Sequence, residues 1–376
     1  MSDASPRAAY VHVPFCLHKC GYCDFTVLAG RDDLSTAYLD AIERELRTLE
    51  RPRVVDTLFI GGGTPTHLSA AELDRLASLL REWLPLADGG EWSVEANPHD
   101  LPDAKLDALA AAGVTRVSLG VQSFDPAVLR TLEREHSPEQ ALDAAERVKK
   151  RFATASLDLI FGVPSQSVAS WERTLDEAIA AGLPHVSAYG LTFEKGTAFW
   201  SRRLRGDLVE SPDERQRTMQ RLAMERLPAA GLPQYEISNF ARPGHRCRHN
   251  ETYWAGRPFY GFGPGAASLA DGIRQTNHRS ATTYIKRMLA GQSPVMESET
   301  LDRETQIRER FLLRLRTVEG LSLADFAADF GQTVDDARPG VVDTLAERGW
   351  VEIAARFLRL TPEGRFVGDA VVAELF

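Results

Sequence analysis

The 376-residue sequence has no long apolar run, no excess of basic residues and only four cysteines. No stretch approaches the roughly 18 consecutive apolar residues of a transmembrane helix, so the sequence predicts no membrane span. The N-terminal residues lack the basic segment, apolar stretch and cleavage site of an export signal, which predicts a cytoplasmic protein. A net charge of −9 disfavours nucleic acid as a general partner, because phosphate binding needs basic patches.

Three of the four cysteines lie within the segment CLHKCGYC, at Cys16, Cys20 and Cys23. In a reducing compartment, clustered thiols are more often metal ligands or redox groups than structural disulfides. The spacing C-x3-C-x2-C can hold three irons of a 4Fe–4S cluster on one tight loop. The fourth iron then stays open to a small ligand, as in a catalytic metal site.

A zinc ion is the alternative occupant of the cysteine segment. Structural zinc needs four ligands, and His12, His18 or Cys247 could supply the fourth. The cluster is the favoured interpretation, because the three-cysteine spacing directly after a first strand is more specific than a lone C-x2-C.

Apolar segments alternate with amphipathic stretches from residue 8 to about residue 195. This alternation predicts repeated βα units and a parallel sheet. Six strands are predicted, at residues 9–15, 56–62, 91–97, 116–122, 156–162 and 185–193. Because a closed barrel has eight strands, we predict an open, partial (β/α)6 barrel, with a doubly wound sheet as the alternative. Both architectures place the chemistry at the C-terminal strand ends.

The sequence predicts three parts along the chain. Residues 1–210 form the partial barrel, and residues 211–299 form a helix followed by a glycine- and aromatic-rich segment of irregular strands and loops. Residues 300–376 form a small winged-helix-like α+β domain. Its candidate recognition helix, residues 341–350, carries two acidic residues and one arginine, which favours a structural or protein-contact role over DNA binding.

The cysteine segment, GGGTPT at residues 61–66 and EANP at residues 95–98 together resemble the radical S-adenosylmethionine (SAM) superfamily. In that superfamily SAM chelates the open iron of the cluster. The resemblance therefore implies that Cys16, Cys20 and Cys23 hold a 4Fe–4S cluster. It also implies that SAM is bound by Tyr10, Tyr22, Gly62, Gly63, Thr64, Glu95, Gln122, Arg134 and Asp158.

Three of these assignments have plain structural alternatives. Tyr22 could be an ordinary loop aromatic, and Arg134 a solvated charge at a helix end. Asp158 could be a satisfied polar group beside the core.

Over nearly its whole length the chain is similar to the oxygen-independent coproporphyrinogen III oxidase group. The segments YVHVPFCLHKCGYCDF, FIGGGTPT, VEANP, LGVQSF and LDLIFGVPSQ occur in the expected order. That group contains oxidases and HemW-type heme chaperones. The oxidases carry another cysteine two positions after the third, where this chain has Phe25. They also have an N-terminal extension, whereas Tyr10 already lies in the first predicted strand here, so the chain resembles the chaperones more.

Residues 249–254 read HNETYW and match a motif that the HemW branch associates with heme binding. The resemblance implies that His249 is an axial iron ligand on an exposed loop, with Tyr253 and Trp254 offering flat faces to the porphyrin. Cys247, flanked by two arginines that could lower its pKa, is a second candidate ligand. A half-buried, inert thiol is the favoured interpretation of Cys247.

The leading hypothesis is a heme chaperone that carries a SAM-ligated 4Fe–4S cluster. It implies heme as cargo, an acceptor hemoprotein and an electron donor. A cluster-dependent homodimer is a further option. The alternative is an oxygen-independent coproporphyrinogen III oxidase, which converts two propionates to vinyl groups. A radical SAM enzyme with another substrate is the third hypothesis.

Overall fold

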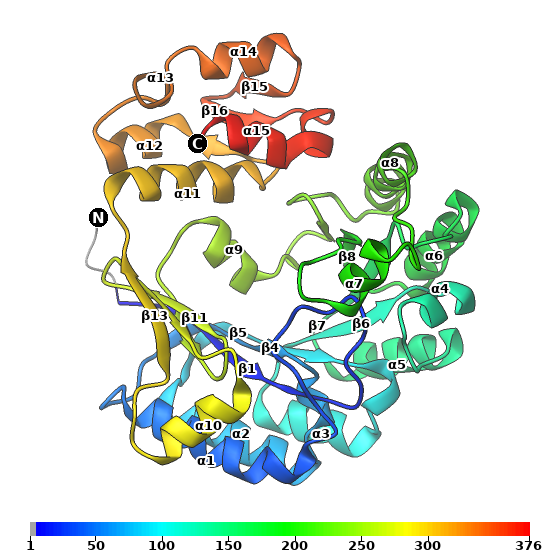
Figure 1. Ribbon diagram of the computed structural model, residues 1–376, viewed down its shortest axis with the longest axis vertical. Helices are drawn as coiled ribbons and strands as arrows, with labels where there is room; N and C mark the ends of the chain where they lie inside the picture. Colours follow the sequence, from blue (N-terminus) through cyan, green and yellow to red (C-terminus); the bar gives the residue numbers. More distant parts are fainter. Residues whose placement is uncertain (1–4) are drawn as a thin grey trace.

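The computed structural model describes residues 5–376 and has one central sheet of eight strands (Figure 1). Six parallel strands form its body: β1 (Ala8–Val13), β4 (Val55–Gly62), β5 (Leu86–Ala96), β6 (Arg116–Gln122), β7 (Thr154–Phe161) and β8 (His185–Gly190). At one edge β10 (Tyr260–Phe262) pairs parallel with β1, and at the other β9 (Asn239–Ala241) pairs antiparallel with β8. The predicted open, partial barrel is confirmed, with two short edge strands added.

Helices between the strands pack their apolar faces against the sheet. The main ones are α1 (Ser35–Arg47), α2 (Ala70–Trp83), α3 (Asp103–Ala112), α5 (Pro138–Arg151), α6 (Val168–Ala181) and α8 (Asp213–Ala229). Two shorter helices also follow strands: α4 (Pro126–Thr131) and α7 (Ala198–Leu204). Ser69 and Ser137 form capping boxes at the starts of α2 and α5, and Gly113 and Gly182 end α3 and α6 in the left-handed conformation.

The segment expected to be irregular is more regular than predicted. HNETYW lies in a short helix, α9 (Arg248–Trp254). A separate antiparallel sheet follows, made of β11 (Ala267–Ala270), β12 (Ile273–Asn277) and β13 (Val295–Thr300), and α10 (Ala281–Leu289) packs on α1. The helix α9 depends on tertiary contacts described below, which local sequence does not reveal.

The C-terminal part has its own apolar core and the predicted winged-helix-like arrangement. It contains α11 (Arg303–Leu315), β14 (Leu321–Ser322), α12 (Leu323–Phe330), α13 (Val334–Ala337), α14 (Val341–Glu347), β15 (Val351–Ala354), β16 (Phe357–Leu360) and α15 (Gly368–Glu374). An ion pair of 2.7 Å between Arg316 and the buried Glu236 fastens it to the rest of the chain. The exact three-part division stays a prediction. Within residues 5–376, no helix is long and apolar enough to cross a membrane.

A buried carboxylate on α1 joins the outer elements to the barrel. Glu45 accepts hydrogen bonds from Gly263 N (2.8 Å), Asn277 Nδ2 (2.7 Å) and Tyr284 Oη (2.5 Å). These donors follow β10, end β12 and lie on α10, respectively. Full burial raises the pKa of Glu45 to about 7, and the three hydrogen bonds oppose that rise.

This raised pKa predicts a loss of stability with rising pH. Between about pH 4.5 and about pH 7 the folded protein keeps a proton on Glu45 that the unfolded chain has lost. The contribution of Glu45 to the free energy of unfolding therefore falls by about 3 kcal/mol across that window. Urea unfolding of the parent chain and of Glu45→Gln at several pH values checks this. The stability difference between them should shrink as pH rises; a constant difference would contradict the prediction.

Candidate functional site

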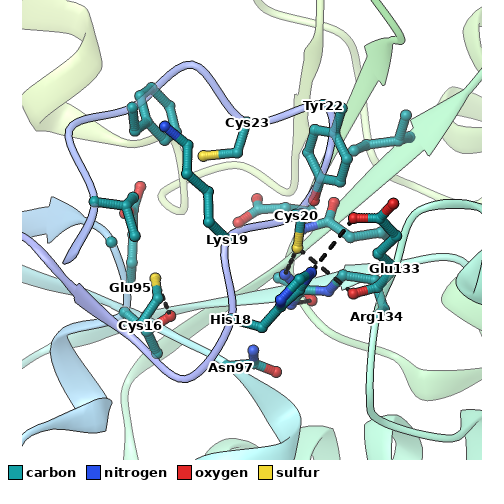
Figure 2. A pocket seen from close by; sticks show the side chains of 18 of the residues that line it. Cys16, His18, Lys19, Cys20, Tyr22, Cys23, Glu95, Asn97, Glu133 and Arg134 are labelled. Atoms are coloured by element: carbon teal, nitrogen blue, oxygen red, sulfur yellow. Dashed lines mark hydrogen bonds and ion pairs between the residues drawn. The ribbon is translucent and has the colours of Figure 1, made fainter. Parts of the chain in front are cut away.

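The three clustered cysteines line one cavity at the C-terminal ends of the barrel strands. β2 (Phe15–Cys16) pairs with β3 (Leu28–Ala29) and closes the intervening residues into a loop above β1. The cavity has a volume of about 410 Å³, and Figure 2 shows the sulfurs of Cys16, Cys20 and Cys23 around it. We call it the cysteine cavity.

Glu133, which sequence reasoning missed, fastens the cysteine loop from the segment after α4. Its carboxylate accepts from Gly21 N at 2.8 Å and pairs with Arg202 at 2.8 Å and His18 at 3.3 Å. These partners lower the pKa of Glu133 against the opposing effect of its burial, so it stays ionised. Its only signal in the sequence is its position next to Arg134.

Gly21 has no room for a side chain. A Cβ atom there would lie 2.7 Å from the Phe199 ring and 3.1 Å from Glu133 Oε1. Phe199 N also donates to Gly21 O at 2.8 Å, so the loop cannot shift freely.

We therefore expect Gly21→Ala to displace the cysteine loop, at a cost of about 1–3 kcal/mol for overpacking. Iron and sulfide content after anaerobic reconstitution should fall, while the circular dichroism of the barrel stays unchanged. Adding Phe199→Leu makes room for the methyl group and should recover part of the iron. Full iron content in Gly21→Ala alone would contradict this account.

The cysteine cavity suits a cubane cluster better than a single zinc ion. Among the described residues no three His, Cys, Asp or Glu side chains converge on one point as a single metal ion requires. In a cubane cluster each thiolate holds a different iron, so convergence is not needed. The proposed fourth zinc ligands also lie elsewhere: His12 bonds Thr26 O, His18 pairs with Glu133, and Cys247 is buried in another cavity. Burial raises the pKa of the Cys16 thiol to about 11, which metal coordination would override.

Most residues assigned to SAM by resemblance lie around the same cavity. The lining includes Tyr22, Gly62, Gly63, Thr64, Glu95, Gln122, Arg134 and Asp158. Their convergence follows from the parallel sheet, because the loops after successive strands meet at one rim. Tyr10 is the exception, since it lies deeper in the barrel and not in the lining of this cavity.

The glycine triplet lets β4 approach β1 closely. Gly62 has a φ of +107°, and a Cβ atom there would lie 2.4 Å from the His12 ring. A Cβ atom on Gly63 would lie 2.6 Å from Phe15 O. Both glycines are therefore required by packing as well as by any ligand that approaches their backbone.

Two carboxyl groups and an arginine give the cysteine cavity its polar character. Burial raises the pKa of Glu95 to about 8, helped by nearby Asp158 and opposed by the 2.9 Å hydrogen bond from Gly62 N. Burial also raises the pKa of Asp158, which accepts from Ser118 Oγ at 2.7 Å. Arg134 donates to Gly120 O at 2.8 Å and lies 3.8 Å from Cys20 Sγ, so it is no solvated helix-end charge.

Gln122 adds an observation that points to function. This residue ends β6 with a φ of +64°, a left-handed conformation that is unfavourable for a residue with a side chain. Such strain is characteristic of ligand-binding positions, and Gln122 lies in the cavity wall.

A second cavity of about 420 Å³ lies inside the barrel, and we call it the histidine cavity because His185 and His249 line it. Five residues line both cavities: Phe25, Glu95, Ser118, Asp158 and Tyr189. The two cavities therefore adjoin. Phe25, which stands where the oxidases have a cysteine, lies at their junction.

His249 and Tyr253 both reach the histidine cavity from α9. His249 is buried, and both of its ring nitrogens are occupied: Nδ1 is 3.0 Å from Thr57 Oγ1 and Nε2 is 2.8 Å from Tyr253 Oη. Burial lowers the pKa of His249 to about 3, so the imidazole is neutral at physiological pH.

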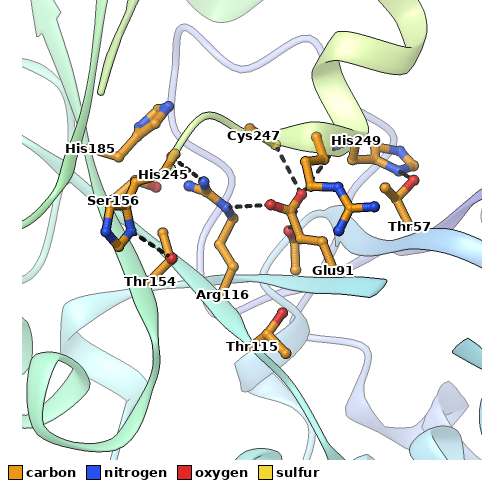
Figure 3. A network of polar contacts seen from close by, with 12 residues as sticks. Thr57, Glu91, Thr115, Arg116, Thr154, Ser156, His185, His245, Cys247 and His249 are labelled. Carbon is orange, nitrogen blue, oxygen red and sulfur yellow. Dashed lines mark hydrogen bonds and ion pairs between the residues drawn. The ribbon is translucent and has the colours of Figure 1, made fainter. Parts of the chain in front are cut away.

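A buried ion pair holds the start of α9 against the barrel (Figure 3). Glu91 on β5 accepts from Arg116 Nε at 3.2 Å and from His249 N at 3.2 Å. The second bond satisfies an N–H group that every helix N-terminus leaves unpaired. Cys247 Sγ lies 3.7 Å from Glu91 Oε1, and burial raises the pKa of Cys247 to about 12. The flanking arginines therefore do not activate this thiol.

Comparison with known proteins agrees with this geometry. Residues 10–178 match the radical SAM superfamily and residues 301–367 match the HemN C-terminal domain. A heme chaperone HemW of Bacillus subtilis is 36% identical over 97% of this chain and 98% of that protein. HemW of Mycobacterium tuberculosis H37Rv is 39% identical over 98% of this chain and 95% of that protein. The chain belongs to the HemW family.

The HemW family shares its fold with an oxidase of known structure. Coproporphyrinogen III oxidase (HemN) from Escherichia coli has a TM-score of 0.87 to this chain, covers 99% of it, and is 24% identical. The match covers 90% of HemN and shows the common fold alone. Membership of the radical SAM superfamily implies an iron–sulfur cluster and SAM, and the thiols and strand-end groups of the cysteine cavity suit them.

The structure corrects one expectation for this HemW family member and bears on two others, which stay untested. His249 is a buried residue on a helix and not on an exposed loop, because Glu91 and Thr57 anchor it from the barrel. Trp254 does not line the histidine cavity; the Arg316 guanidinium of the C-terminal part covers its ring at 5.0 Å. Tyr10 lies in the histidine cavity, with its hydroxyl 3.0 Å from His12 Nδ1, because its position on β1 is well below the strand end.

Proposed function

We propose that the protein is a cytoplasmic heme chaperone that carries a SAM-ligated 4Fe–4S cluster and transfers heme to an acceptor hemoprotein. The observation that carries the proposal is the adjoining pair of cavities, with three cysteines around one and the HNETYW residues His249 and Tyr253 in the other. Bound heme at the second cavity would lie next to the cluster, which would let the state of the cluster govern binding or release.

In this proposal Cys16, Cys20 and Cys23 hold three irons. Around SAM we place the lining residues Tyr22, Gly62, Gly63, Thr64, Glu95, Gln122, Arg134 and Asp158. When bound, the cluster and SAM supply one-electron chemistry. The chain itself contributes an ordered loop held by Glu133, a strained Gln122 and buried carboxyl groups that can accept hydrogen bonds.

His249 is the proposed axial ligand of the heme iron, with Tyr253 beside it. The neutral imidazole has the protonation state that ligation needs. If its Nδ1–H donates to Thr57, the lone pair on Nε2 is available once the Tyr253 hydroxyl moves away. Trp254 would then support α9 from outside, through Arg316, instead of touching the porphyrin.

Heme transfer tests the proposal. The protein is reconstituted anaerobically with iron and sulfide, loaded with hemin with or without SAM, and mixed with an apo-hemoprotein whose spectrum reports heme uptake. Cluster-dependent uptake would support the proposal. Anaerobic conversion of coproporphyrinogen III to protoporphyrinogen IX with SAM and a reductant would overturn it in favour of an oxidase. Sedimentation of the same samples would show whether the cluster promotes a homodimer.

A further inference from the structure

The wall of the histidine cavity formed by β8 and β9 contains buried polar atoms without partners. His185 on β8 and Asn239 on β9 are each 2% exposed and line the cavity. Within residues 5–376, His185 Nδ1 and Asn239 Oδ1 find no hydrogen-bond partner. Leaving a buried polar group unpaired is costly, so two such groups on residues that line one cavity indicate a missing ligand or solvent molecule.

The hydrogen bonds around Tyr235 determine which proton His185 carries. Cys247 N donates to Tyr235 Oη at 3.2 Å, so the hydroxyl is free to donate its own proton to His185 Nε2, 2.8 Å away. Burial holds the pKa of His185 well below its usual value, so the ring is neutral. The remaining ring proton is then on Nδ1, so His185 carries an unpaired N–H donor on the wall of the cavity.

Arg116 supplies a second donor on the same wall. Its Nε bonds Glu91 at 3.2 Å and its Nη2 bonds His245 O at 2.5 Å. No hydrogen bond of Nη1 is found among the described residues. Figure 3 shows the Arg116 side chain between Glu91 and His245. Strand register brings the two donors near each other, because Arg116 pairs with Thr154 on β7 and Ser156, two residues further on, pairs with His185.

The occupant must therefore offer acceptors to an arginine and to a neutral imidazole. A carboxylate does this with two oxygens in one plane, which matches the donor geometry of a guanidinium. Ser156 and Ser187 line the same wall; the Ser156 hydroxyl is 2.6 Å from Ser118 Oγ, which itself donates to Asp158 at 2.7 Å. A water molecule held by the carboxylate could donate to Asn239 Oδ1. Burial raises the pKa of both carboxyl groups in the lining, Glu95 and Asp158, which favours their uncharged forms and reduces repulsion of a bound carboxylate.

We propose that Arg116 and His185 form a carboxylate subsite in the histidine cavity and that it takes a propionate of the bound porphyrin. The inference rests on the proposed heme-binding function and adds a second anchor point, distinct from the iron ligand. A porphyrin held at its iron and at one propionate has a fixed orientation in the cavity.

The test compares hemin with hemin dimethyl ester, in which both propionates are uncharged, in one detergent buffer. We expect the parent protein to bind hemin at least about tenfold more tightly than the ester, as is typical for charge-assisted hydrogen bonds. This comparison changes only the ligand, so it does not depend on the folding of a variant. Equal affinities for hemin and ester would overturn the subsite alone. Absence of binding by both would overturn the heme proposal and the subsite with it.

A matched pair of variants locates the subsite. Glu91→Gln keeps the arginine and should keep the preference for hemin over the ester. The double variant Glu91→Gln with Arg116→Gln removes the arginine without leaving a buried carboxylate unpaired, and should lose that preference. Retention of the full preference by the double variant would overturn the role of Arg116.

Discussion

A chain carrying Cys20→Ala is expected to lose nearly all of its iron and sulfide after anaerobic reconstitution. Substituting a residue that only contacts a metal ligand lowers metal affinity by about 10–100-fold. Cys20→Ala removes a ligand itself, so a larger loss is expected. The side chain of Cys20 lines the cysteine cavity beside Arg134, and the other two thiols in that lining, Cys16 and Cys23, are already assigned to other irons. Iron content and the visible absorption of the cluster measure the outcome.

Cys247→Ala is the matched control for that experiment. Cys247 is the fourth cysteine of the chain, but it is 4% exposed and lies against Glu91 in the histidine cavity. The control should therefore keep the iron content of the parent chain. Comparable iron loss in both variants would show that the cluster is not held as proposed, and so would full iron in Cys20→Ala.

The fold could be predicted from the sequence because its signals are local and repeated. Each barrel strand is an apolar segment followed by a helix with its own cap, as at Ser69 and Ser137, so the strand positions are confirmed to within a few residues. The shared site at the cysteine cavity could also be predicted from local sequence signals. Parallel strands bring their C-terminal ends together, and motif positions at those ends predict a shared site.

The histidine cavity could not be predicted because long-range contacts create it. Glu91 and Arg116 look like ordinary charges at strand starts, yet they form a buried pair that anchors α9. His249 was expected on an exposed loop because a glycine-rich, aromatic neighbourhood gives no helical period. Trp254 was expected against the porphyrin because the motif resemblance implied it. The direction of its side chain on the short helix α9 depends on the partner that covers it, here Arg316.

Two variants of α9 should change hemin affinity in opposite directions. His249→Ala removes the proposed iron ligand and should weaken hemin binding at least about tenfold, with a changed Soret band. Tyr253→Phe removes the hydroxyl that occupies His249 Nε2 at 2.8 Å in the ligand-free protein. Breaking that hydrogen bond costs about 1 kcal/mol, so its removal should tighten hemin binding by roughly fivefold.

Opposite changes in hemin affinity in these two variants would distinguish iron ligation by His249 from a purely structural role of this residue. If His249 only supported α9, losing either partner of the 2.8 Å hydrogen bond would weaken hemin binding alike. Tyr260→Phe is the control, because Tyr260 lies on the edge strand β10 and outside both cavity linings. Unchanged affinity and spectrum in His249→Ala would show that the iron ligand is another residue. Weaker binding in Tyr253→Phe would contradict the prediction that the tyrosine hydroxyl competes with the heme iron for His249 Nε2.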